Sequence, residues 1–252
     1  MKYTFAQTGV LSLMIWSPSA YALFDAEVFY GQSRFVAKFT AIDATEKSVT
    51  VKSTEMAASL LLDPIPVVPF AFGLMALKTT TNLNQYVTAI TDDLSTSPLY
   101  SNWTFTGKGE SNTTYYGPVI KIWAPIPKLT PYIKAAYLIG VETQTESIEG
   151  EAGSSGTLAL ALTRKPITTY KHTDTEVTFG LGVSPLKKTQ LFLEYTVHAG
   201  RRTATALSGS ASATIAEISV STPYTSADLS DANKKEQSFS ATCVRIGLGV
   251  GI

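Results

Sequence analysis

The chain has 252 residues, of which 20 are basic and 20 acidic, so its formal net charge is zero and nucleic acid is not expected as a partner. Its single cysteine, Cys243, excludes an internal disulfide framework and a multi-cysteine zinc site, and with two histidines no metal or other cofactor is expected. Charged residues make up 16% of the chain, below the roughly 25% usual for soluble domains, which predicts a surface poorly matched to water.

The N-terminal segment has the three parts of a secretory signal peptide. Lys2 supplies a positive charge, the run GVLSLMIW is apolar, and Ala20-Tyr21-Ala22 forms a small-x-small cleavage pattern. We therefore expect residues 1–22 to be removed by cleavage after Ala22 and residues 23–252 to form the mature domain. No later apolar stretch reaches the roughly 18 to 20 residues that a membrane helix needs, so the sequence predicts export without a helical anchor.

Strand-like segments dominate the mature chain. Apolar residues alternate with polar or small ones over segments of roughly 9 to 16 residues, and no convincing helical period is present. The predicted strands are 26–42, 49–62, 67–80, 112–124, 130–145, 172–184, 189–203 and 236–251.

The connections between these strands alternate in length. Proline-marked tight turns occur in the stretches DPIPVVPF (63–70), APIPKLTPY (124–132) and SPLKKTQLF (184–192), and proline belongs at turns because it lacks the N–H that a sheet requires. The other links are long, at 81–111, 146–171 and 204–235, apart from a short one near 43–48. Tight turns at one end and long loops at the other predict an all-β fold, a closed antiparallel up-and-down transmembrane β-barrel of eight strands with short periplasmic turns and long external loops. Segments 156–163 and 212–222 are β-prone and leave ten strands as an alternative.

The alternation predicts which residues face lipid and which face the barrel interior. In the last strand, Val244, Ile246, Leu248 and Val250 would face outward and Arg245 inward. An outward charge near the bilayer midplane costs about 2 to 4 kcal/mol for Lys or Arg and less for Asp or Glu, which also settles the orientation of the weaker first strands. The predicted interior set is Glu27, Glu55, Lys121, Lys134, Glu142, Glu176, Glu194, His198 and Arg245.

These patterns resemble the small eight-stranded outer-membrane barrels of the OmpA, OmpX and OmpW type over residues 23–252. The resemblance rests on the signal peptide, the proline turns, the alternation and the terminal strand CVRIGLGVGI. It implies the outer membrane as location, the lipid bilayer and lipopolysaccharide as surroundings, and the barrel-assembly machinery as a partner during biogenesis. The last residue is Ile252, where the family usually has an aromatic residue. No peptidoglycan-binding domain of the kind that often follows such barrels is expected.

The interior set has two interpretations. Eight strands enclose a space that side chains can fill, so the charges can form a plug of ion pairs, or they can act as a gate that lets small solutes pass. The first interpretation predicts a structural or surface-interaction protein and the second a narrow channel for small or apolar solutes.

Three further features have candidate roles. Arg201 and Arg202, expected where a strand leaves the membrane, can bind lipopolysaccharide phosphates or remain solvated, and the external loops can bind surface ligands. Phe70, Trp123 and Tyr132, beside the turns, are expected in an aromatic girdle at the interface. A lipid A-modifying enzyme is the least favoured alternative, because neither His172 nor His198 has a clear nucleophile nearby, and we predict no enzymatic activity.

Overall fold

Nine antiparallel strands make up most of the computed structural model, which describes residues 24–64, 68–124, 126, 128–152, 160–186, 188–215, 218–229 and 234–251. The predicted signal peptide lies outside these residues. The strands are β1 (Phe24–Thr40), β2 (Glu46–Leu62), β3 (Phe70–Asn82), β4 (Trp103–Trp123), β5 (Leu129–Ala152), β6 (Leu160–Leu186), β7 (Thr189–Ile215), β8 (Ile218–Pro223) and β9 (Gln237–Gly251).

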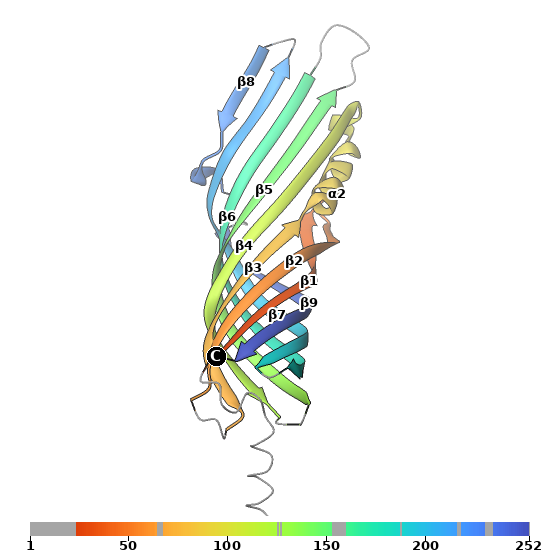
Figure 1. Ribbon diagram of the computed structural model, residues 1–252. Helices are drawn as coiled ribbons and strands as arrows, with labels where there is room; N and C mark the ends of the chain where they lie inside the picture. Colours follow the sequence, from red (N-terminus) through yellow and green to blue (C-terminus); the bar gives the residue numbers. More distant parts are fainter. Residues whose placement is uncertain are drawn as a thin grey trace, which may run out of the picture.

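Eight of these strands close into a ring (Figure 1). The order runs β6-β5-β4-β3-β2-β1-β9-β7, and pairing of β6 with β7 completes the circle. The predicted eight-stranded up-and-down barrel is confirmed. The alternative of ten strands is wrong for the described part of the chain, because β8 pairs only with β7 and lies outside the ring.

The two ends of the barrel differ as the connections predicted. Short links join β2 to β3, β4 to β5 and β6 to β7 at the end where β1 begins and β9 ends. Lys128 and Lys188 reverse the chain in two of these links with left-handed backbones, at φ values of 67° and 66°. All three proline turns lie partly outside the described residues, which omit 65–67, 125, 127 and 187.

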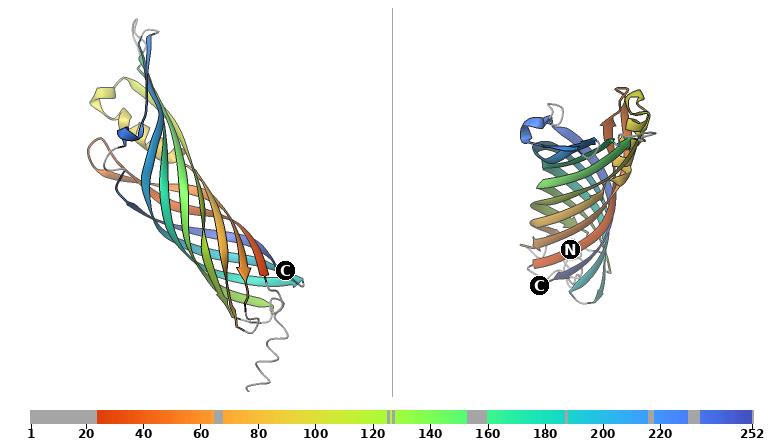
Figure 2. Two further views of the ribbon diagram at one scale, coloured as in Figure 1. Left: turned by 90° about the vertical axis from the view of Figure 1, so that its left-hand side faces the viewer. Right: turned by 90° about the horizontal axis from the view of Figure 1, so that it is seen from above.

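Strands β4 to β7 are longer than predicted and carry one side of the wall beyond the ring (Figure 2). They have 21, 24, 27 and 27 residues, against 13 to 17 in β1, β2, β3 and β9. The β-prone segments 156–163 and 212–222 therefore contribute to β6, β7 and β8 in this projecting sheet, as far as they are described. The predicted strands stop too early at the end with long loops. Hydrogen bonding between neighbouring strands continues there through Ser- and Thr-rich sequence that we interpreted as loop.

A helix, α2 (Asn84–Ser95), contradicts the expectation of a chain without helical segments. It lies within the predicted loop 81–111 and packs on β4, where Val87 is fully buried in the space left by Gly107 and Gly109. Asp93 ties the helix to the β1–β2 turn by accepting a hydrogen bond from the Ile42 N–H at 2.7 Å. Of the helices in the described part of the chain, none has the length and apolar character that a membrane-crossing helix needs.

The outer wall of the ring is apolar. Large hydrophobic side chains on alternate positions of every strand are exposed, among them Val28, Leu60, Leu74, Ile120, Ile139, Phe179, Leu193 and Ile246. A soluble monomer rarely exposes an apolar surface of this extent, because the cost of hydrating it would be large. The wall therefore matches a hydrocarbon solvent, and the polar residues between these positions face the interior.

Candidate functional site: the charged barrel interior

The structure places every member of the predicted interior set inside the ring. Each of the nine residues is at most 5% exposed, and Arg245 is 0% exposed. The register explains why they meet: Glu55 pairs with Gly31, Gly31 with Arg245, and Arg245 with Glu194, so one row across four strands points inward. Directly paired residues of a sheet share a face, which brings charges from distant parts of the chain together. We describe the resulting contacts as a lower, a middle and an upper cluster, counted from the end with short turns.

The lower cluster alternates carboxylates and ammonium groups. Glu27 forms ion pairs with Lys121 and, at 3.4 Å, with Lys134. Lys134 also pairs with Glu194, whose Oε1 accepts a hydrogen bond of 2.7 Å from the Tyr132 hydroxyl. Each buried charge thus has an opposite charge beside it, which is the condition under which such groups are tolerated away from water.

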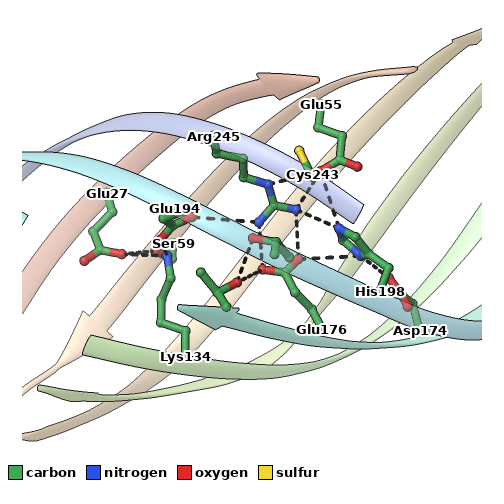
Figure 3. A network of polar contacts seen from close by, with 12 residues as sticks. Glu27, Glu55, Ser59, Lys134, Asp174, Glu176, Glu194, His198, Cys243 and Arg245 are labelled. Atoms are coloured by element: carbon green, nitrogen blue, oxygen red, sulfur yellow. Dashed lines mark hydrogen bonds and ion pairs between the residues drawn. The ribbon is translucent and has the colours of Figure 1, made fainter. Parts of the chain in front are cut away.

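The middle cluster is built around Arg245 of β9 (Figure 3). Its Nη1 and Nη2 donate to both oxygens of Glu176 at 2.7 and 2.9 Å, while Nε and Nη2 donate to Glu55 at 3.0 and 2.7 Å. His198 lies next to the guanidinium, with Nε2 at 3.2 Å from Nη2 and Nδ1 bonded to Asp174 at 2.7 Å. The planar guanidinium matches two carboxylates at once, a task for which lysine has the wrong geometry.

The upper cluster centres on Glu142 of β5. This carboxylate contacts His172 Nε2 at 2.6 Å, Ser111 Oγ at 2.5 Å and Arg202 Nη1 at 3.2 Å. The other nitrogen of His172, Nδ1, lies 3.1 Å from the Tyr115 hydroxyl. Together, the three clusters form polar contacts at successive levels of the ring's interior.

Aromatic rings fill the lower half of the interior. Lys134 Nζ lies 3.7 Å from the centre of the Phe29 ring, and Phe192 packs against both Phe29 and Tyr132. Glycines opposite these rings provide the space: a Cβ on Gly180 would lie 2.1 Å from Tyr132 Cζ. The tight packing agrees with the small cross-section of an eight-stranded barrel.

Above the middle cluster the interior opens into a cavity of about 400 Å³. Its polar wall includes Asp174, His198 and Glu142, and its apolar wall includes Phe35 and Phe239. The β1–β9 ladder ends at the pair Phe35–Ala241, although both strands continue beyond it. Residues from both strands above this pair line the cavity, which therefore reaches the gap between them.

Two expectations are corrected by the structure. Arg201 and Arg202 remain within β7, where neighbours point to opposite faces. Arg201 is exposed and pairs with Glu236 at 2.9 Å, whereas Arg202 points inward to Glu142, so the two do not form a joint basic site. Tyr132 is buried in the lower cluster and does not belong to an interfacial girdle, and Trp123 packs against the same interior core.

Six polar residues of the site were not in the predicted set: Ser111, Tyr115, Tyr132, His172, Asp174 and Arg202. All six lie an even number of residues from a predicted inward residue of the same strand, so the alternation contained the signal. His172 and Asp174 stand at the beginning of the predicted strand 172–184. In fact β6 begins twelve residues earlier, at Leu160, which puts both side chains deep in the interior.

A closed ring of eight antiparallel strands with an apolar outer wall and a filled polar interior is the architecture of small outer-membrane β-barrels. Among solved structures, the chain is similar to the Neisserial surface protein A, with 8% identity, a TM-score of 0.37 and coverage of 91% of this chain and 97% of that one. It is similar to Ail, the attachment invasion locus protein of Yersinia pestis, with 10% identity, a TM-score of 0.36 and coverage of 90% and 97%. The outer membrane protease OmpT of Escherichia coli matches with 11% identity, a TM-score of 0.35 and coverage of 91% and 96%. No protein-family model matches the chain, and neither does any curated protein. The predicted likeness to small outer-membrane barrels is confirmed.

Proposed function

We propose that the chain is an integral outer-membrane barrel with a structural or surface-interaction role, whose lumen is closed by its own charged side chains. The observation that supports a plug is the position of Arg245, which is fully buried and joins Glu55 of β2 to Glu176 of β6 across the interior. An open pore would leave these groups hydrated. Here each of them has an opposite charge within hydrogen-bonding distance, and aromatic rings fill the space below.

The location and orientation belong to the same proposal. The predicted signal peptide, cleaved after Ala22, would deliver the chain to the periplasm, where the barrel-assembly machinery inserts it with the short turns facing inward. The projecting sheet of β4 to β8 would then lie outside the cell, among lipopolysaccharide and possible ligands of the external segments. Arg201, exposed on β7, is the remaining candidate for a phosphate contact with lipopolysaccharide.

The surface role is supported by the sheet that projects beyond the ring. It extends the wall well past the closed part of the barrel, and its edge strand β8 exposes Ile218 and Val220. A wall that served only to anchor the protein in lipid would have no need of this length. We propose that this sheet presents the binding surface for partners outside the cell.

Conductance in planar lipid bilayers separates the plug from the channel interpretation. The purified barrel is expected to give no steady openings, and Arg245→Ala is expected to produce them because it removes the cation that holds two carboxylates together. Arg201→Ala, which removes an exposed arginine from the same sheet, is the matched control and is expected to stay silent. Steady openings of the unaltered protein would contradict the plug and establish the narrow channel.

A catalytic role in lipid A modification is not supported by the histidine geometry. His198 has both ring nitrogens engaged, one by Asp174 and one by Arg245, and His172 is held in the same way by Glu142 and Tyr115. We therefore propose that both histidines are structural. Mass spectra of lipid A from cells that overproduce the protein are expected to be unchanged, and a new lipid A mass would contradict this.

A further inference from the structure

Asp174 lines the cavity, and one oxygen of its carboxylate has no hydrogen-bond partner among the described residues. Asp174 is 2% exposed, its Oδ2 accepts from His198 Nδ1 at 2.7 Å, and its Oδ1 has no partner among the described residues. An unsatisfied buried acceptor is costly, and the cost is greater when the group is charged. A donor that enters the cavity would remove this penalty.

The charge balance of the three clusters favours a cationic donor. Their carboxylates are Glu27, Glu55, Glu142, Asp174, Glu176 and Glu194, and their permanent cations are Lys121, Lys134, Arg202 and Arg245. Six negative groups thus face four positive ones. His198 can supply a fifth positive charge when protonated, because it lies 2.7 Å from Asp174 and 3.5 Å from Glu55. When His198 alone is protonated, one carboxylate still lacks a matching positive charge.

The remaining walls of the cavity indicate what kind of cation fits. Phe35, Phe39, Tyr115 and Phe239 supply aromatic surface, and the threonines of β3 and β4 supply hydroxyl groups. Aromatic faces attract ammonium groups and also pack against an apolar body. The volume of about 400 Å³ lies within the range of pockets that hold small organic molecules. No cluster of three or more metal-binding side chains occurs among the described residues, which favours an organic cation over a metal ion.

We propose that this cavity is a binding site for a small organic cation, a protonated primary amine with an aromatic or aliphatic body. The ammonium group donates to Oδ1 of Asp174, and the body lies against Phe35 and Phe239. The site adjoins the plug, because Asp174 and His198 belong to the middle cluster and also line the cavity. This inference rests on the surface role proposed above and names a ligand for it. The ligand would enter from the outer end of the barrel or through the gap between β1 and β9.

Calorimetric titration of the folded protein in detergent tests the proposal with 2-phenylethylamine as the probe. The matched ligand is 2-phenylethanol, which has the same body without the charge. The amine is expected to bind at least about tenfold more tightly than the alcohol, since hydrogen bonds to charged groups are the stronger ones. Asp174→Asn is expected to weaken amine binding by a similar factor and to leave binding of the alcohol unchanged.

Two further variants keep the test decisive. Glu149→Gln removes an exposed carboxylate outside the cavity and is expected to bind the amine as the unaltered protein does. Ala241→Phe keeps every charge but fills the cavity, and it is expected to abolish binding. The proposal is overturned if the amine does not bind, if amine and alcohol bind equally, or if Asp174→Asn binds the amine unchanged. Should Asp174→Asn fail to fold, undiminished binding by Ala241→Phe overturns it instead.

Discussion

Arg245 on β9 donates two hydrogen bonds to Glu176 on β6, at 2.7 and 2.9 Å, although β7 lies between these two strands in the ring. The contact therefore crosses the interior and does not follow the wall. Together with Glu55 on β2 it connects opposite sides of the barrel through one guanidinium.

Loss of this guanidinium is expected to destabilise the barrel strongly. Arg245→Met leaves Glu55 and Glu176 buried without their cation, which should lower the free energy of unfolding by about 3 to 5 kcal/mol. Urea unfolding in lipid vesicles measures the change. Arg201→Met, which breaks an exposed pair with Glu236, is expected to cost about 0 to 1 kcal/mol. Adding Glu176→Gln to Arg245→Met should recover part of the loss, and equal effects of the two arginine variants would contradict the role given to Arg245.

The solvent outside the ring can be tested by placing a charge on the wall. Val244 on β9 directly precedes Arg245 in the chain and is 55% exposed on the wall. Val220 on the projecting strand β8 is 64% exposed. In lipid vesicles, Val244→Arg is expected to lower stability by about 2 to 4 kcal/mol, because the charge enters hydrocarbon. Val220→Arg should change it by no more than about 0.5 kcal/mol, since that side chain is in water. If Val244→Arg is tolerated as well as Val220→Arg, the membrane assignment is wrong.

The packing of Tyr132 against a glycine predicts a sharp difference between two neighbouring substitutions. Gly180→Ala would bring a Cβ to 2.1 Å from Tyr132 Cζ, whereas at Gly182 the nearest atom would be Phe192 Cε1 at 3.2 Å. We expect Gly180→Ala to displace the ring from Glu194 and to cost about 1 to 3 kcal/mol in unfolding free energy, as overpacking usually does. Gly182→Ala should cost distinctly less. Similar costs at the two sites would show that the ring moves freely.

The contact between α2 and the β1–β2 turn is expected to depend on pH. Hydrogen bonds from Lys47 at 2.5 Å and from the Ile42 N–H at 2.7 Å lower the pKa of Asp93 below its ordinary value of 3.8. Because the folded pKa is the lower one, the ionised carboxylate stabilises the contact above about pH 3.8, and this contribution disappears as the pH falls through the lowered pKa.

Hydrogen exchange of the Ile42 amide measures this dependence. Protection of the amide is expected at neutral pH and to be lost in acid, after correction for the intrinsic rate. Asp93→Asn should lose most of the pH dependence, while Asp92→Asn, one residue earlier on the same helix, should behave as the unaltered protein. A protection factor that does not change with pH would contradict the clamp.

The alternation of apolar and polar residues was sufficient to predict the ring and the inward orientation of Glu194 and Arg245. It was equally able to separate Arg201 from Arg202, but we treated that pair as one basic site at the end of a strand. Helix α2 also had a signal, since Val87, Ile90 and Leu94 are spaced three and four residues apart within the link 81–111. The signal from one short amphipathic segment is weak among so many strand-like segments. The burial of this helix also depends on Gly107 and Gly109 of β4, which lie further along the chain.

What the sequence determined by itself is therefore the class of fold and which side of each strand meets which solvent, because that choice depends on a period of two along a single strand. The tertiary structure alone decided which charges meet. Glu55, Glu176 and Arg245 are far apart in the chain, and their contact depends on the register of the strands between them and on the closure of the ring. A single-residue shift in any ladder would turn one of them to the wall. The cavity beside Asp174 has the same origin, since its walls come from residues of several strands that only the closed ring brings together.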